Sequence, residues 1–294
     1  MADVLEFVLK LSLVIFMVGN LLDMGLKLNL GEAIRDLGNV RFVAFSLLWG
    51  FVLLPGLAYA IAKIIPMDHP YAMGLVLLGM TPCAPFLPPM VERAKGDMGY
   101  TAAFMLLASV VTVVYMPFAV PVLVKGLSAS AWTIAKPLVL FLLVPFALGL
   151  IIQRRSTSLA ARIEPIVKKL TGIDTVLMLL LCVVIYGKKF VALEGSYAIG
   201  AQIIFFFLAT VGPYLLSFGL LRAQRTVLSL GMATRNLGAA FAPLFAIRGV
   251  DQRAIVMVAL GVIMQATFSF GAATFYGRNA ENGKAAAHSA GGNA

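Results

Sequence analysis

The segment that decides the fold is an apolar stretch interrupted by prolines, Thr81-Pro82-Cys83-Ala84-Pro85-Phe86-Leu87-Pro88-Pro89. Four prolines in eight residues cannot continue a regular helix, because each lacks an N–H group and clashes with the preceding turn. The apolar residues on both sides indicate a membrane segment, where unpaired backbone groups are tolerated only inside the protein or around a water-filled cavity. The stretch therefore predicts a broken helix that lines a functional site.

A second interrupted segment lies in the other half of the chain, Gly231-Met232-Ala233-Thr234-Arg235-Asn236-Leu237-Gly238, with Pro243 shortly after it. It places polar residues between two glycines in the middle of an apolar span. Paired broken helices at corresponding places in two halves point to the binding site of a transporter. We expect the helices to break at Pro82, Pro85, Pro88, Pro89, Gly231 and Gly238.

The composition of the whole chain agrees with a membrane protein. Its 294 residues are 61% hydrophobic and 12% charged, and the mean hydropathy is +0.96. Soluble domains carry roughly 45–50% apolar and about 25% charged residues. Because the apolar runs are long and continuous, and do not alternate as barrel strands do, they predict an all-α polytopic protein whose surface meets the lipid bilayer.

Nine transmembrane helices are predicted from these runs. They cover residues 5–25, 40–63, 70–95, 98–124, 132–153, 172–187, 195–221, 226–247 and 253–276. The transmembrane domain thus occupies residues 1–278. Residues 279–294 are small and polar, with little to bury, so we expect a disordered tail.

The orientation follows from the basic residues. With the N-terminus outside, 14 Lys and Arg residues fall in the inner segments and 7 in the outer ones. This bias predicts an external N-terminus and a cytoplasmic C-terminus, as for a multi-pass protein of a bacterial inner membrane. The net charge of +10 resides mainly in these loops, and without a basic stripe interleaved with aromatic residues no nucleic-acid partner is expected.

The two broken segments resemble those of the bile acid:sodium symporter family. The first is similar to the family's Cys-Pro-Gly-Gly-Thr-Ala-Ser-Asn, and the second to Glu-Val-Gly-Met-Gln-Asn-Ser-Gly, which falls on residues 231–238. The resemblance runs from about Met24 to Tyr276. It implies a panel of residues 5–25, 132–153 and 172–187. It also implies an inverted-repeat core of residues 40–124 and 195–276, where the broken helices cross.

The resemblance also implies two sodium sites, but most of their ligands are replaced. The family's Ser-Asn pair becomes Leu87-Pro88, its acidic residue becomes Gly231, and a Gln becomes Arg235. A further Gln corresponds to Gly50, and only Thr101 keeps a ligand oxygen. We therefore expect no metal site and no cofactor, and doubt that sodium drives transport.

Arg235 is the main candidate for a functional residue, because a charge within a membrane span is costly and marks function by default. Three interpretations stay open. Its guanidinium binds an anionic substrate, or it replaces the sodium ions by holding the free carbonyls of the half-helices, or it reaches toward an interface. The further candidates for substrate binding are Asn236, Thr234, Thr81 and Gln265.

These features predict a secondary transporter that moves a small organic anion, bile-acid-like and carrying a carboxylate or sulfonate, by alternating access. The alternative is a channel or a membrane sensor that uses the same crossing site. An enzyme is not expected, because motifs such as HExxH and GxSxG are absent from the sequence. The sequence sets neither the substrate nor the oligomeric state. Lys10 is expected to extend toward the outer surface.

Overall fold

The computed structural model describes residues 2–124, 130–191, 195–247 and 249–291. Within these ranges the regular elements are all helices, and the only β-type pairing is one isolated bridge. Six helices of the described part are long and apolar enough to cross a membrane: Phe7–Lys27, Val40–Ile64, Met98–Leu123, Ala131–Arg155, Ala198–Leu216 and Gln252–Asn282. The prediction of a helical multi-pass membrane protein is confirmed, and the count of nine spans stays a prediction.

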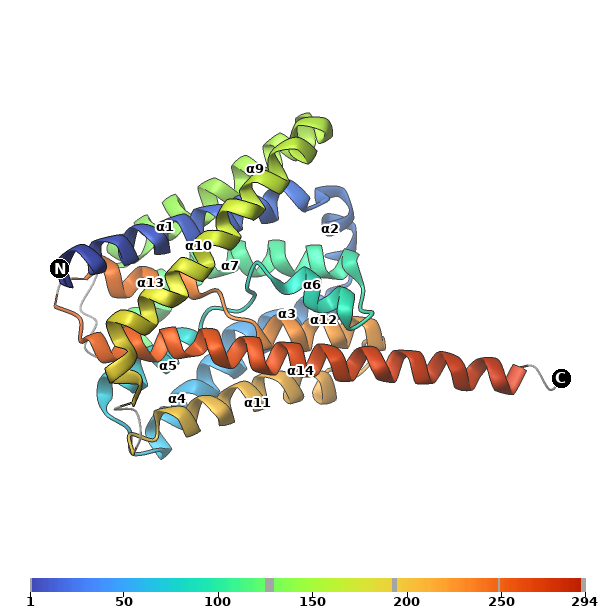
Figure 1. Ribbon diagram of the computed structural model, residues 1–294. Coiled ribbons are helices and arrows are strands. Elements are labelled where there is room, and N and C mark those ends of the chain that lie inside the picture. The colour runs from blue at the N-terminus through green and yellow to red at the C-terminus, as the bar shows by residue number, and fades with distance from the viewer. Residues whose placement is uncertain (1, 125–129, 192–194, 248, 292–294) are drawn as a thin grey trace.

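The elements follow the predicted spans closely (Figure 1). In chain order they are α1 (Ala2–Lys27), α2 (Leu30–Asp36), α3 (Val40–Leu48), the π-helical turn η1 (Trp49–Leu53), α4 (Leu54–Ile64), α5 (His69–Gly79), α6 (Leu87–Arg93), α7 (Met98–Leu123), α8 (Ala131–Leu138), the π-helical turn η2 (Val139–Leu143), α9 (Val144–Arg155), α10 (Thr157–Val191), α11 (Ala198–Leu216), α12 (Arg222–Ala233), α13 (Leu237–Ala246) and α14 (Gln252–Gly291).

Both segments expected to be interrupted are divided into two short helices. The first forms α5 and α6, and the second forms α12 and α13. In Figure 1, α5 and α13 lie in the left half of the bundle and α6 and α12 in the right half. The two breaks therefore lie near the middle of the bundle.

The helices pack in two groups. α1 packs mainly on α9 and α10. In Figure 1, α1 and α9 lie along the upper edge of the molecule, and α10 runs diagonally from that edge toward the lower left. The second group is held by the contacts of α11 with α12 and of α5 with α4 and α14. The groups meet where α8 packs against α7 and α13.

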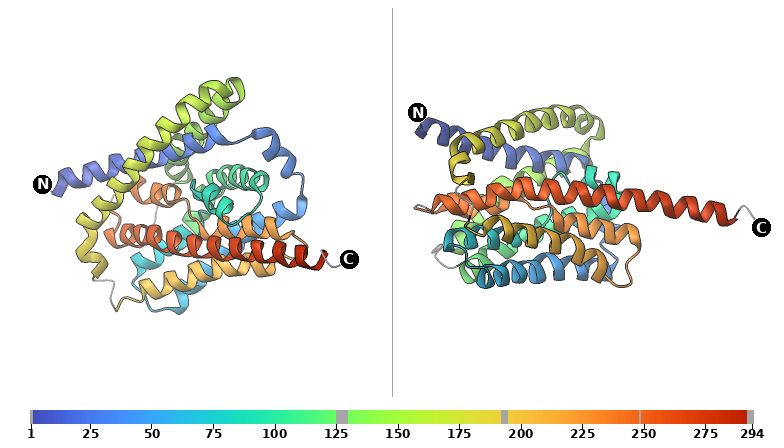
Figure 2. Two further views of the ribbon diagram at one scale, coloured as in Figure 1. Left: turned by 45° about the vertical axis from the view of Figure 1, so that its right-hand side comes forward. Right: turned by 60° about the horizontal axis from the view of Figure 1, so that its bottom comes forward.

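Two stretches are helical where we expected a loop or disorder. Residues 157–171 form the first turns of α10. Ser156 caps the start of this helix, because its hydroxyl accepts the Leu159 N–H at 3.2 Å. We expected disorder from residue 279, but α14 continues to Gly291 beyond the bundle (Figure 2). Its extension is rich in alanine, the strongest helix former. Lys95 also pairs with Glu281, and Arg222 Nη1 donates to the Asn279 carbonyl at 2.9 Å.

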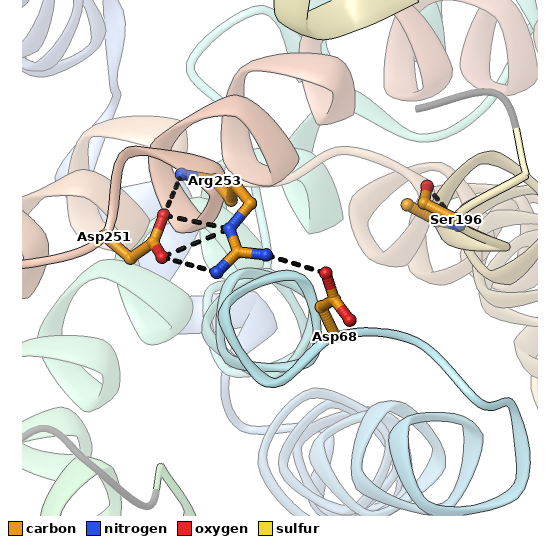
Figure 3. A network of polar contacts seen from close by, with 5 residues as sticks. Asp68, Ser196, Asp251 and Arg253 are labelled. Atoms are coloured by element: carbon orange, nitrogen blue, oxygen red, sulfur yellow. Dashed lines mark hydrogen bonds and ion pairs between the residues drawn. The ribbon is translucent and has the colours of Figure 1, made fainter. Parts of the chain in front are cut away.

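At the end of the bundle that holds the N-terminus, an ion-pair cluster ties α14 to α5. Arg253 Nη1 donates to Asp68 just before α5 at 2.7 Å, and Nη2 donates to Asp251 at 2.8 Å (Figure 3). The two chain ends lie at opposite ends of the bundle (Figure 1). The cluster thus fixes where α14 begins relative to the first broken helix.

Candidate functional site

The unwound segments of the two broken helices lie side by side and run antiparallel. The Cys83 N–H donates to the carbonyls of Gly231 at 3.1 Å and Thr234 at 2.9 Å. The Asn236 N–H donates to the Thr81 carbonyl at 2.9 Å, and Pro82 and Arg235 form the isolated bridge. Each segment thus supplies hydrogen-bond partners that the other lost when its helix ended, as a membrane interior requires.

Four helix ends surround this pairing, which we call the crossing. The C-termini of α5 and α12 enter it, and the N-termini of α6 and α13 leave it. Helix C-termini carry partial negative charge and helix N-termini partial positive charge. Arg235 follows α12 by two residues and pairs with Pro82, which follows α5. The backbone of a cationic residue therefore lies close to two C-terminal ends.

Arg235 is fully buried, with 0% of its surface exposed. Its backbone N–H donates to Gln265 Oε1 at 2.6 Å, and the guanidinium carbon lies 5.2 Å from the centre of the Phe205 ring. None of the three side-chain nitrogens has a hydrogen-bond partner in the described part of the chain. The interpretation in which Arg235 reaches an interface is wrong. The direct hydrogen bonds to carbonyls that the second interpretation expects are not found among the described residues.

The two threonines of the crossing have structural partners. Thr81 Oγ1 donates to the carbonyl of Leu78 at 3.3 Å, within the last turn of α5. Thr234 Oγ1 donates to the Leu230 carbonyl at 2.9 Å and accepts the Ala84 N–H at 3.3 Å. Both hydroxyls therefore complete broken helix ends.

The remaining predicted polar residues also support the crossing. The side chain of Asn236 accepts the Ala239 N–H at 3.1 Å and caps α13. Gln265 on α14 holds the backbone of Arg235. Thr101, the residual sodium-site position, lies apart from this arrangement and donates to the Asp97 carbonyl at 2.7 Å in the first turn of α7. Among the described residues, no group of three or more His, Cys, Asp or Glu side chains is placed to hold a metal ion.

Four of the six predicted helix breakers lie inside helices. Pro88 and Pro89 occupy the first turn of α6, where a missing N–H costs nothing. Gly231 and Gly238 lie within α12 and α13. They allow close packing instead, because an added Cβ would overlap the Phe104 ring at Gly231 and Met17 at Gly238. Pro82 and Pro85 alone of the six lie in an unwound segment.

A cavity of about 900 Å³ opens between the two helix groups, at the end of the bundle that holds the N-terminus. Its walls come from α1, from α8 with η2, and from the stretch between α13 and the start of α14. Most of the lining is apolar, and the polar side chains are those of Lys10, Thr133, Lys136 and Gln252. The volume falls in the range of about 300–1,000 Å³ that is usual for small-molecule sites.

The two lysines stand on separate walls of this cavity. Lys10 begins the α1 wall, which continues with Leu13, Val14 and Met17. Lys136 belongs to the α8 wall, and both lysines are exposed. Each wall follows the spacing i, i+3, i+4, i+7 of one helical face. That spacing was the signal in the sequence that could have placed Lys136 on a cavity wall, and Lys10, expected to extend toward the outer surface, lies on the cavity as well.

The crossing and the cavity are separate in this conformation. None of Arg235, Asn236, Thr234, Thr81 and Gln265 lines the cavity. The five residues do come together at the crossing, through the hydrogen bonds described above. Between the two regions, Met17 on the cavity wall packs against Gly238 in the first turn of α13.

The family model described as Sodium Bile acid symporter family matches residues 13–193. The match spans α1 through α10 and includes the first broken helix. Its members are transporters. No curated protein matches the chain.

Proposed function

We propose that this chain, which belongs to the Sodium Bile acid symporter family, is a secondary transporter of small organic anions that works by alternating access without sodium coupling. In the orientation we propose, the N-terminus lies outside the cell and the C-terminus lies in the cytoplasm, as for a protein of a bacterial inner membrane. The nine predicted spans give the odd number that this orientation needs.

The observation that carries the proposal is the cavity, with one lysine on each of two walls. The apolar lining suits a hydrocarbon or ring system, and lysines suit a carboxylate or sulfonate as point charges. Lys10 and Lys136 come from different helices, so an anion held by both joins α1 to α8. The expected substrate class is therefore an amphipathic organic anion of bile-acid-like size.

The position of the cavity supports alternating access. It lies between α1 and α8 on one side and α13 and α14 on the other, and so between the two helix groups. A rocking movement of one group against the other closes it at this end and opens a path toward the other end. The contact of Met17 with Gly238 is the point at which such a movement begins to separate the groups.

The fixed charge of Arg235 supports transport without sodium. A guanidinium does not lose its proton in proteins, so it remains a cation near the C-termini of α5 and α12. Sodium ions bind such helix ends in transporters with broken helices. A permanent cation in the same place repels a metal ion and makes it unnecessary.

The proposal is tested by counterflow of radiolabelled taurocholate in proteoliposomes that contain the purified protein. We expect saturable uptake that is accelerated by unlabelled taurocholate inside the vesicles, because a carrier returns faster when loaded. Uptake that grows linearly with concentration, together with single-channel currents in planar bilayers, would instead identify a channel. Binding of taurocholate without any movement would identify a sensor.

A further inference from the structure

The interface between α1 and α10 contains a buried acid that no sequence pattern singled out. Asp174 lies on the face of α10 that packs on α1, and it is 7% exposed. Thr171 and Met178 are its neighbours on the same buried face, three residues before it and four residues after it. This part of α10 therefore presents a carboxyl group to the inside of the bundle.

The two carboxyl oxygens of Asp174 have different surroundings. Oδ1 accepts a hydrogen bond from Ser12 Oγ on α1 at 2.7 Å. Oδ2 is buried and has no hydrogen-bond partner in the described part of the chain. No lysine or arginine of that part forms an ion pair with either oxygen. Because a buried carboxylate without a cation is costly, this setting favours the protonated, neutral acid.

The charged groups on the helices around Asp174 face elsewhere. On α1, Lys27 bonds Asp23 at 2.6 Å and Glu164 at 2.9 Å, and Lys10 lines the cavity. On α10 itself, Lys168 and Lys169 are exposed. On α9, Arg154 and Arg155 lie in the last turn. On α14, Arg253 lies in the first turn, and Arg278 and Glu281 lie in the second half of the helix. The acid is thus left to be neutralised by a proton.

We propose that Asp174 is the proton-binding group that couples transport to a proton gradient. This inference rests on the proposed function, since it names the coupling ion of that transporter. A proton from the water on one side forms an O–H bond at the Asp174 carboxyl, and the bond breaks when the proton leaves to the water on the other side. One proton carried with a singly charged anion makes the cycle electroneutral.

The link between the proton and the substrate runs through α1. One face of α1 carries Ser12, which donates to Asp174, and another face carries Lys10, Leu13 and Met17 of the cavity wall. Loss of the proton places a negative charge next to Ser12 and changes how α1 packs on α10. Since α1 is one wall of the cavity, the protonation state of Asp174 shifts the geometry in which the anion is held.

The proton site is tested without a substrate by infrared spectroscopy on the purified protein in lipid. We expect a carbonyl stretch of a protonated acid that persists at neutral pH and is missing in Asp174→Asn. The matched control Asp68→Asn removes an exposed acid and should keep the band. A band that is unchanged in Asp174→Asn overturns the assignment.

The coupling is tested with taurocholate and an imposed gradient in proteoliposomes. With one proton per anion, a gradient of one pH unit, acidic outside, should raise accumulation up to about tenfold. Asp174→Asn should abolish that dependence, and Asp68→Asn should keep it. If uptake by the unaltered protein does not depend on the pH gradient, the coupling is overturned. The proposed transport function is then unaffected. If taurocholate does not move at all, the proposed function fails for that anion, and the infrared result still decides whether Asp174 binds a proton.

Discussion

The crossing and the cavity both contain cationic side chains, but the cation of the crossing is buried and the cations of the cavity are exposed. Arg235 at the crossing is completely buried, and its guanidinium lies over the Phe205 ring without a hydrogen-bond partner among the described residues. Lys10 and Lys136 are exposed on the walls of a cavity. The same charge is therefore fixed inside the protein in one region and reachable from outside it in the other.

This difference separates two roles that the sequence had assigned to one residue. A cation that meets water costs little and can bind an anion that arrives and leaves. A buried cation is tolerated only where its surroundings stabilise it continuously. We therefore assign the support of the helix ends to the charge of Arg235, acting without direct hydrogen bonds, and the recognition of the anion to the two lysines. The predictions below are arranged to separate these assignments.

The largest effect is expected at Arg235. Arg235→Gln removes the charge of a residue whose backbone lies next to two helix C-termini, and the interaction of a cation with one such end is worth up to about 2 kcal/mol in a favourable buried geometry. We expect a lower thermal stability and at least about a tenfold loss of taurocholate counterflow, with Arg235→Lys intermediate. Thermal unfolding in detergent and counterflow measure the two effects. An Arg235→Gln protein that is more stable than the original would show that the buried charge destabilises the protein and does not support the helix ends.

A smaller effect is expected from the packing of the crossing. Gly231→Ala places a methyl group into the Phe104 ring, and overpacking typically costs about 1–3 kcal/mol. The matched control is Gly200→Ala in α11, where nothing lies within 4 Å of an added Cβ. We expect a clear drop in melting temperature for the first variant and no drop for the second. Equal melting temperatures would show that the crossing is not tightly packed.

In the cavity the effect should fall on affinity and leave stability unchanged. Lys10→Ala and Lys136→Ala should each raise the half-saturating taurocholate concentration about fivefold, since one exposed charge contact is worth about 1 kcal/mol. Lys63→Ala, an exposed lysine outside this cavity, is the control and should change nothing. Unchanged affinity in the double variant Lys10→Ala, Lys136→Ala would remove the lysines from the binding site.

The smallest effect is expected at the ion-pair cluster of Figure 3. Arg253→Ala breaks the contacts with Asp68 and Asp251, whose side chains are exposed by 63% and 40%. Exposed ion pairs contribute about 0–1 kcal/mol. We expect a shift in melting temperature that shrinks further at high salt and no change in counterflow. A loss as large as that of Arg235→Gln would mean that position rather than burial decides the effect.

Much of the fold was predictable because the bilayer constrains it strongly. The long apolar runs located most of the helices within a few residues, as for Met98–Leu123 against the predicted 98–124, but not the start of α10 or the end of α14. Prolines without an N–H located the first break at Pro82 and Pro85. The midspan arginine located the second. These features depend on local backbone chemistry, which a single sequence displays directly.

The site was only partly predictable, because it depends on how helices rotate against each other. The sequence around a glycine does not show whether it ends a helix or makes room for a neighbouring ring. Gly231 makes room for the Phe104 ring. The depth of Arg235 could be read from spacing, but the direction of its side chain could not. The cavity arises only when the α1 and α8 faces meet α13. Asp174 was missed because it lies at the start of the predicted span 172–187, where an acidic residue is easily assigned to the preceding loop.

The central claim is that a fixed guanidinium takes the place of sodium while the cavity binds the anion. The most direct measurement is the initial rate of taurocholate uptake into proteoliposomes with sodium outside, compared with an equal concentration of a large organic cation. We predict equal rates in the two media, and the same equality after Lys10→Ala and Lys136→Ala lower the affinity. A rate that requires sodium in the unaltered protein contradicts the claim.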